Sequence, residues 1–249
     1  MNMRKIVFIF LTNLIYAQQI EIDSVKNKTS SKKIKLKQLI IPSVLIGYGV
    51  IGIESDGLIM VNSGIKEEVN ENIDEKFTID DFSQYVSAAS VYGLNAFGVN
   101  GKHNFKDRSI ILGTSYLIMS TSVLSLKSIT KVERPDGSAF NSFPSGHTAT
   151  AFAGAEFLWQ EYKDVSIWYG ISGYVIATGT GIFRMYNDRH WLTDVVAGAG
   201  IGILSTKIAY WINTFIQMKI FNSKENNSTL IIAPFYNRKQ LGISFVNTF

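Results

Sequence analysis

The chain has 249 residues and a mild net charge of +4, from 24 Lys and Arg against 20 Asp and Glu. Hydrophobic residues make up 46% and charged residues only 18%, whereas soluble domains carry about 25% charged residues. This composition excludes a disordered chain and a strongly basic nucleic-acid-binding protein, and it indicates contact with a membrane bilayer. The sequence contains no cysteine, which excludes disulfides, cysteine-ligated zinc, iron–sulfur clusters and thiol nucleophiles.

The N-terminal region predicts a targeting or anchoring segment followed by a linker. Residues 1–17 combine a basic start, an apolar run of about a dozen residues and the small residue Ala17, as in a secretory signal peptide. An uncleaved N-terminal anchor is the alternative, although the run is short for a spanning helix. The polar, Lys-rich residues 18–37 are typical of a linker.

Apolar segments predict an all-α domain over residues 38–218, namely a bundle of about six helices that is mostly embedded in a membrane. We expect the helices at 38–53, 82–101, 109–126, 148–160, 165–183 and 191–217. The second, third and fifth of these contain no charged residue and are close to membrane-spanning length. Gly198 and Gly202 lie four residues apart, which predicts a close approach between two helices.

Loop charges predict the orientation of the bundle. Residues 101–108 are basic and residues 54–81 are acidic, so the positive-inside rule places the former in the cytoplasm and the latter outside. The loops near 127–147 and 184–194 then also lie outside. The Lys-rich residues 26–37 conflict with this scheme if a signal peptide is cleaved, unless the first apolar segment enters the membrane without crossing it.

The C-terminal tail, residues 219–249, has two strand-like runs on either side of residues 237–239. This pattern predicts a short β-hairpin, which we expect to cap the helices. The alternative is that the final strand, which ends at Phe249, is an outer-membrane sorting signal.

A first polar cluster contains Lys127, Arg134 and Pro135. Seven residues advance a helix by nearly two turns, so the two cations are expected on one helical face, with the proline ending the helix. Together they form a clamp for an anion, because arginine presents a planar fork to phosphate oxygens. Taken alone, such a basic pair is usually a solvated helix end.

A second cluster contains Ser145, Gly146 and His147 at the start of a predicted helix. Backbone N–H groups at a helix N-terminus favour an anion, and glycine lets the backbone approach it closely. Taken alone, the serine is also explained as an N-cap and the histidine as an interfacial side chain.

A third cluster contains Arg184, His190 and Asp194. The histidine and the aspartate are separated by four residues, which makes them neighbours on one face of a helix. A carboxylate on one imidazole nitrogen leaves the other nitrogen nucleophilic. A surface ion pair is the alternative. All three clusters are expected on the same side of the bundle. Together they would supply cations around an anion, a nucleophile and an acid, which are the groups needed for phosphoryl transfer without a metal.

The spacing of the three clusters, K-x6-RP, PSGH and R-x5-H-x3-D, resembles the type-2 phosphatidic acid phosphatase and vanadium haloperoxidase superfamily over roughly residues 82–217. One departure is Phe183, where the family usually has serine before the arginine. The resemblance implies that His190 attacks phosphorus, Asp194 orients it and His147 protonates the leaving oxygen. It also implies the phosphate-binding residues Lys127, Arg134, Ser145, Gly146 and Arg184.

The resemblance implies a metal-independent lipid phosphatase with no cofactor, acting at the outer face of a bacterial inner membrane on phosphatidic acid, phosphatidylglycerol phosphate, undecaprenyl diphosphate or a lipid A phosphate. The expected partners are the phosphorylated lipid and the bilayer, with no nucleic acid and no obligate protein partner. The alternatives are a periplasmic non-specific acid phosphatase and a non-catalytic membrane protein that binds an anion.

Overall fold

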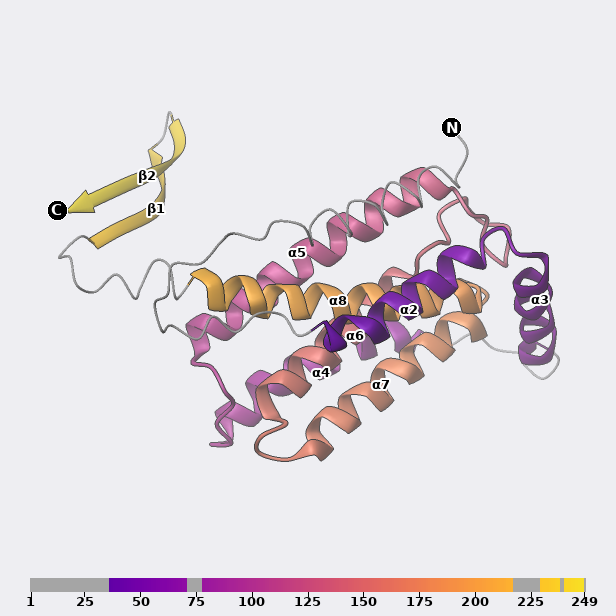
Figure 1. Ribbon diagram of the computed structural model, residues 1–249, viewed down its shortest axis with the longest axis horizontal. Coiled ribbons are helices and arrows are strands. Elements are labelled where there is room, and N and C mark those ends of the chain that lie inside the picture. The colour runs from indigo at the N-terminus through magenta and orange to yellow at the C-terminus, as the bar shows by residue number, and fades with distance from the viewer. Residues whose placement is uncertain (1–35, 71–77, 217–228, 238–239, 249) are drawn as a thin grey trace. The chain divides into compact units, whose positions relative to one another are not determined.

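The computed structural model describes residues 36–70, 78–216, 229–237 and 240–248, and within these ranges it contains seven helices (Figure 1). They are α2 (Lys37–Ile51), α3 (Asp56–Asn70), α4 (Ile79–Ala96), α5 (Phe105–Thr130), α6 (Gly146–Tyr162), α7 (Ile167–Tyr186) and α8 (Leu192–Ile216). The all-α class predicted for the bundle is confirmed. The signal peptide or anchor expected at residues 1–17, and nearly all of the expected linker, lie outside the described residues.

Helix α3 was not expected, because it occupies most of the segment that the charge pattern assigned to an acidic loop. Its apolar residues Ile65 and Val69 are spaced as on one helical face, and its charges lie between them. Asp56 lies in the first turn, where a carboxylate favours the helix N-terminus. The axes of α2 and α3 make an angle of 92° across a short break, so the chain turns sharply between them.

Membrane-spanning length and composition are met by fewer helices than the sequence suggested. Among the described helices, α5 and α8 are long and apolar enough to cross a membrane, and the bent pair of α2 and α3 adds a third span if it is counted as one. Helices α4 and α7, which cover most of the uncharged segments 82–101 and 165–183, have 18 and 20 residues but are not among these candidate spans. An uncharged segment is not necessarily apolar, and these two helices are rich in Ser, Gly and Tyr.

Close helix packing around α8 depends on glycine. A Cβ atom on Gly198 would lie 2.5 Å from the carbonyl oxygen of Ser145, and one on Gly202 would overlap the carbonyl oxygen of Ala149. Both glycines therefore face α6, and the predicted close approach is confirmed. Gly200 faces the opposite way, where a Cβ would lie 2.7 Å from the carbonyl oxygen of Pro42 in α2.

Helix α6 is the centre of the bundle, since it packs against α4, α5, α7 and α8. It is lined with small residues on several faces, and its buried alanines include Ala149, Ala153 and Ala155. Because α6 touches four neighbours, its N-terminal end is surrounded by the ends of other helices. That end carries the second polar cluster.

The described parts of the C-terminal tail are two segments, β1 (Thr229–Asn237) and β2 (Gln240–Thr248). They pair antiparallel, with Thr229 opposite Thr248 and Asn237 opposite Gln240. They are no part of the all-α fold of residues 37–216, and the expectation that this tail caps the helices stays a prediction.

Candidate active site

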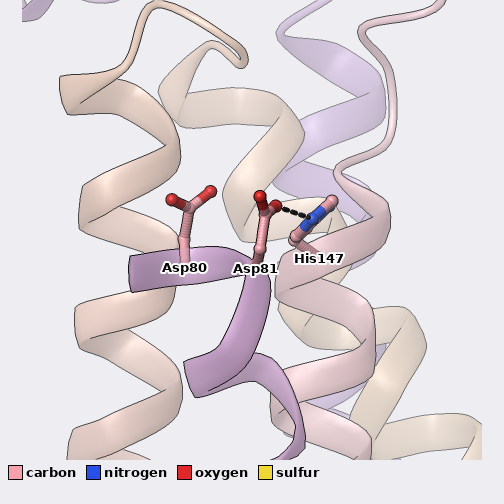
Figure 2. Close-up of side chains that lie close together, drawn as sticks. All are labelled: Asp80, Asp81 and His147. Atoms are coloured by element: carbon pink, nitrogen blue, oxygen red, sulfur yellow. Dashed lines mark hydrogen bonds and ion pairs between the residues drawn. The ribbon is translucent and has the colours of Figure 1, made fainter. Parts of the chain in front are cut away.

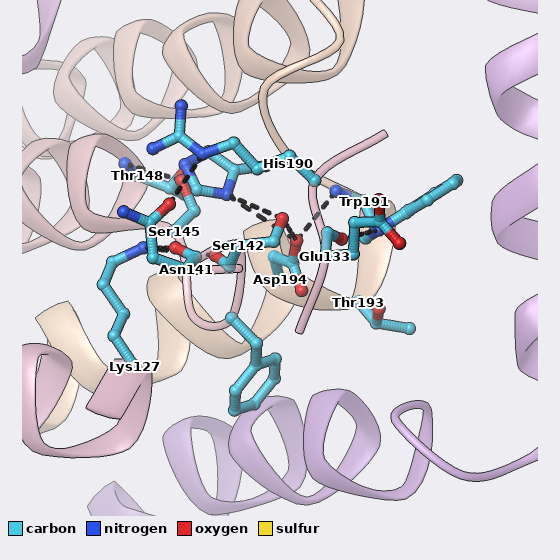
Figure 3. A network of polar contacts seen from close by, with 12 residues as sticks. Lys127, Glu133, Asn141, Ser142, Ser145, Thr148, His190, Trp191, Thr193 and Asp194 are labelled. Carbon is cyan, nitrogen blue, oxygen red and sulfur yellow. Dashed lines mark hydrogen bonds and ion pairs between the residues drawn. The ribbon is translucent and has the colours of Figure 1, made fainter. Parts of the chain in front are cut away.

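The three polar clusters meet at one end of the bundle, where α5 and α7 end and α6 and α8 begin (Figure 3). The backbone N–H of Ser145 donates a hydrogen bond of 3.0 Å to the carbonyl oxygen of Asp194, which joins the second cluster to the third. Lys127 donates to the carbonyl oxygens of Asn141 and Ser142, which joins the first cluster to the segment before α6. The prediction that the clusters share one side of the bundle is confirmed.

His190, Asp194 and Ser142 form a buried polar group (Figure 3). The histidine Nδ1 lies 3.6 Å from Oδ2 of the aspartate and 3.4 Å from Oγ of the serine. The serine hydroxyl donates to the same Oδ2 at 2.5 Å. The serine oxygen can therefore accept a hydrogen bond from Nδ1–H while the hydroxyl donates to the carboxylate, an arrangement that leaves Nε2 with its lone pair.

The expected helical spacing of His190 and Asp194 is wrong, because the histidine precedes α8, which begins at Leu192. The aspartate lies in the first turn of that helix and accepts the backbone N–H of Trp191 at 2.9 Å. A carboxylate in that position also meets the positive end of the helix dipole. The two residues come together through this N-terminal turn and through the serine, rather than as neighbours on one helix.

The expected helical face shared by Lys127 and Arg134 is also wrong. Helix α5 ends at Thr130, and Lys131 takes a left-handed conformation with φ of 48° and donates its N–H to the carbonyl oxygen of Lys127. The residue before a proline avoids the helical conformation, so Arg134 lies in the following loop. The two cations meet through Asn141, whose side-chain oxygen accepts from Arg134 Nε at 2.8 Å.

The third cation, Arg184, is buried at the end of α7 and bound to an acidic residue of α4. Its Nη1 donates to Oδ2 of Asp80, whose other oxygen accepts from the side-chain amide of Asn187 at 3.1 Å. Arg184 Nε is buried and has no hydrogen-bond partner among the described residues. A buried guanidinium with one unsatisfied N–H favours an anion beside it.

The N-terminus of α6 is formed as the sequence predicted. Ser145 is the N-cap and its hydroxyl accepts from the backbone N–H of Thr148 at 3.4 Å. A Cβ on Gly146 would meet only Val123, at an ordinary 3.7 Å. Protein packing therefore does not require glycine there, which leaves the space beside its N–H as the reason for it.

His147 stands apart from this network (Figure 2). Its Nε2 lies 2.9 Å from Oδ1 of Asp81 in the first turn of α4. Burial, and then the charge of Arg184, hold the pKa of His147 below its usual value, while the hydrogen bond to Asp81 opposes this shift. The histidine is therefore linked to the site through the charge of Arg184.

Asp80, Asp81 and His147 also place three possible metal-ligand atoms within 4.8 Å of one another, a grouping found among the described residues. Each of the three side chains has a hydrogen-bond partner. Arg184 and Asn187 donate to Asp80, and Asp81 and His147 are hydrogen-bonded to each other. These pairings account for the grouping without a cation.

A small pocket reaches His190 from the side of α3. Its walls are largely apolar, with Ile65, Val69 and Met185 among the lining residues. Lys66 also lines it, and its Nζ donates to the carbonyl oxygen of Pro135 at 2.7 Å. The unexpected helix α3 therefore forms one wall beside the candidate nucleophile.

Electrostatics favour a neutral His190 in a positive environment. Burial, together with the charges of Lys127 and Arg184, lowers the pKa of His190 to about 4, against the opposing effect of Asp194. Burial and the charge of Arg184 also lower the pKa of Arg134. The imidazole is thus uncharged at neutral pH, and the surrounding cations repel one another until an anion enters.

The sequence prediction missed four residues that complete the site: Asp80, Asp81, Asn141 and Ser142. The two aspartates were counted only as charges of an external loop, and the other two were taken as part of a short lid. Adjacent acidic residues at the start of an otherwise uncharged helix were a usable signal. Ser142 carried no such signal, because it is fully buried only through tertiary packing.

A family model described as the PAP2 superfamily matches residues 114–217, from α5 to the end of α8. The matched residues contain all three motifs on which the resemblance to this superfamily rests. Phe183, which replaces the usual serine, packs on Tyr186 with ring centroids 5.9 Å apart.

Two curated proteins are similar in sequence to this chain. A lipid A 1-phosphatase of Porphyromonas gingivalis is 40% identical over 160 residues, which cover 59% of this chain and 36% of that protein. The bacitracin transport permease protein BcrC of Bacillus licheniformis is 35% identical over 71 residues, covering 28% and 33% respectively. The chain thus spans about a third of the length of the curated relatives it matches.

Two solved structures are also similar. Aquifex aeolicus LpxE is 23% identical with a TM-score of 0.47, and the match covers 60% of this chain and 94% of that one. A PAP2-type phosphatidylglycerolphosphate phosphatase of Bacillus subtilis is 21% identical with a TM-score of 0.40, and the match covers 89% and 97%.

Proposed function

We propose that the chain is a metal-independent membrane phosphatase that hydrolyses a phosphomonoester or diphosphate group on a lipid through a phosphohistidine intermediate. One observation carries the proposal. A neutral, buried His190 is held at Nδ1 by Ser142 and Asp194, and the cations Lys127 and Arg184 lie near enough to lower its pKa. A neutral imidazole with one nitrogen held and the other free is a nucleophile. The cations favour the charge of the phosphoryl group as it is transferred.

In the first step, His190 Nε2 attacks phosphorus, a P–N bond forms and the P–O bond to the alcohol breaks. His147 gives its proton to the departing oxygen, which leaves as a neutral alcohol. In the second step, water gives a proton to His147 and attacks phosphorus, which releases inorganic phosphate and restores the imidazole. Lys127, Arg134 and Arg184, with the hydroxyl of Ser145 and the backbone N–H of Gly146, hold the phosphate oxygens.

The proposed substrate is a membrane lipid with a terminal phosphate. Two helices of the described chain are apolar enough to span a bilayer, and the pocket beside His190 has mostly apolar walls. The Porphyromonas gingivalis relative is named a lipid A 1-phosphatase, so a phosphorylated glycolipid is our first candidate. Phosphatidic acid, phosphatidylglycerol phosphate and undecaprenyl diphosphate are the others.

A panel of substrates tests this proposal. Detergent-purified protein is assayed for phosphate release in EDTA from each lipid phosphate and from soluble phosphate esters, with His190→Gln as the inactive reference. We expect turnover of a lipid by the wild type alone. Equal turnover of soluble esters would favour a non-specific acid phosphatase, while phosphate binding without turnover would favour a non-catalytic anion-binding protein. Loss of turnover in EDTA would contradict the metal-free mechanism.

We also propose that the site faces the periplasm of a bacterial inner membrane, on the argument from loop charge. The cysteine-free sequence allows a direct test with single cysteines at the exposed positions Ser138 and Lys106. A membrane-impermeant maleimide applied to intact spheroplasts is expected to label Ser138→Cys but not Lys106→Cys, and to label both after permeabilisation. The reverse pattern would contradict the proposed orientation.

A further inference from the structure

Two adjacent carboxylates, Asp80 and Asp81, lie in the first turn of α4, and Figure 2 shows the second of them beside His147. Asp80 binds Arg184 of α7, and Asp81 binds His147 of α6. Consecutive residues of a helix point about 100° apart, so one helical turn can reach two neighbouring helices. Helix α4 packs against both of these helices, which gives each carboxylate its own partner.

Several contacts further along α4 hold this helix in a defined position against its neighbours α6 and α7. The hydroxyls of Ser83 and Thr180 lie 2.8 Å apart, which joins α4 to α7. A Cβ on Gly154 of α6 would lie 3.0 Å from the backbone nitrogen of Ala88, so α4 and α6 are in close contact. The side-chain amide of Gln84 donates to the carbonyl oxygen of Asp81 at 2.9 Å. The carboxylate of Asp81 is therefore presented to His147 by a well-packed helix.

We propose that Asp81 is a positioning residue for His147: it accepts the Nε2–H and holds the imidazolium in place as the acid that protonates the leaving group. The inference rests on the proposed phosphatase function. It is separate from the roles of the three motifs, because Asp81 lies outside all of them and outside the matched residues 114–217.

The charged groups that face His147 support this role. Arg184 of α7 disfavours a proton on the imidazole, while Asp81 and then Asp80 of α4 favour it. Burial has the largest effect and lowers the pKa of His147. Among the groups that raise this pKa, and so keep the acid protonated, Asp81 contributes the most. Removal of that charge is expected to lower the pKa of His147 further.

The proton balance follows from this contact. Asp81 accepts a hydrogen bond from Nε2–H, so the proton given to the leaving oxygen comes from Nδ1 of the imidazolium. The imidazole is then neutral and keeps the Nε2–H bond to Asp81 until water returns a proton. The side chains of His147 and Asp81 are 31% and 53% exposed, so solvent can reach the pair and resupply the proton.

The experiment compares Asp81→Asn with Asp164→Asn, the same change at an exposed position beyond the other end of α6. Each is assayed on the lipid phosphate turned over best by the wild type and on p-nitrophenyl phosphate, whose leaving group needs little protonation. We expect Asp81→Asn to lower kcat on the lipid by about tenfold to a hundredfold and on p-nitrophenyl phosphate by less than about threefold. Asp164→Asn is expected to match the wild type on both.

The pH profile supplies a second readout on the lipid alone. Since His147 acts in its protonated form, the rate is lost as pH rises through its pKa, and Asp81→Asn is expected to move this alkaline limb to lower pH. An equal loss on both substrates with an unchanged profile would show a merely structural role and overturn the proposal. A defect in Asp81→Asn that EDTA reproduces in the wild type would instead indicate a bound cation.

The failure of the two proposals can be told apart. If the wild type releases no phosphate from any substrate, the proposed function fails. If the wild type is active and Asp81→Asn is indistinguishable from Asp164→Asn, the phosphatase function stands and the role of Asp81 is wrong.

Discussion

Two histidine–carboxylate pairs lie by opposite ends of α6, and they differ in burial and in the hydrogen bonds that each carboxylate accepts. His190 and Asp194 lie by its N-terminus, at 3.6 Å and with a serine between them. His103 binds Glu161, near the C-terminus of α6, directly at 2.7 Å. The helix has 17 residues, so the pairs are separated by about 24 Å along its axis.

In the pair at the C-terminus of α6, the carboxylate of Glu161 accepts three hydrogen bonds. Glu161 accepts from Tyr210 at 2.6 Å and from the backbone N–H of His103 at 3.0 Å, in addition to the imidazole. Burial would raise the pKa of Glu161, but the bonds from His103 and Tyr210 hold it below its usual value. Arg108 donates to the carbonyl oxygen of His103. This pair joins the ends of α5, α6 and α8.

In the pair at the N-terminus of α6, the histidine and the carboxylate are joined through Ser142 rather than by a short direct contact. Asp194 is shared between Ser142 and Trp191, and the other charges that act on His190 are the cations Lys127 and Arg184. The difference between the two pairs shows that a histidine–carboxylate pair indicates a catalytic site only when cations that could bind an anion lie beside the histidine. Otherwise the same two residue types act as a structural tie.

The largest expected effect comes from replacing each histidine by glutamine. His190→Gln is expected to lower kcat by ~10⁴-fold or more, because it removes the nucleophile. His103→Gln is expected to retain kcat within about threefold while losing about 1–3 kcal/mol of stability. Phosphate release and thermal unfolding in detergent measure the two. Comparable losses of turnover in both variants would erase the distinction between the pairs.

A second change tests whether the anion site needs arginine geometry rather than charge alone. Arg134→Lys keeps the charge but removes the Nε–H that binds Asn141, so kcat/KM is expected to fall by about a hundredfold. Arg189→Lys is the matched control, since Arg189 binds Asp136 at the surface at 3.2 Å. Equal effects of the two substitutions would mean that Arg134 contributes only to the general positive field.

A third change addresses the serine that distinguishes the two pairs. Ser142→Ala removes the hydroxyl between Nδ1 and the carboxylate, which is expected to lower kcat by about tenfold with little change in KM. Steady-state kinetics on the best lipid substrate measure this split. A full loss of activity, as in His190→Gln, would assign the serine a more direct role, and an unchanged kcat would show that Asp194 acts without it.

The smallest expected effect on chemistry comes from the packing between the two pairs. Gly202→Ala places a Cβ against the backbone of α6 and is expected to cost about 1–3 kcal/mol of stability without changing kcat of the folded protein. Gly179→Ala, where no atom lies within 4 Å, is expected to be neutral or to stabilise by up to ~1 kcal/mol. Equal unfolding temperatures for the two variants would contradict the close α6–α8 contact.

Local patterns were sufficient for the helical class, the close α6–α8 approach and the identity of the motif residues. Small residues four apart and long uncharged segments constrain the backbone over a few turns, so spacing alone carries that information. The same spacing failed at the helix ends, where Arg134 and His190 lie in loops rather than on a helical face. Helix α3 was missed because its charges obscured its amphipathic period.

The tertiary structure decided which side chains complete the site. Arg184 meets Asp80 across 104 positions, and His147 meets Asp81 across 66. Such contacts depend on how α4 is set against α6 and α7, and no local period in the sequence encodes that setting. The sequence therefore determined the kinds of groups available for phosphoryl chemistry, and packing between distant helices determined which carboxylate binds which cation or histidine.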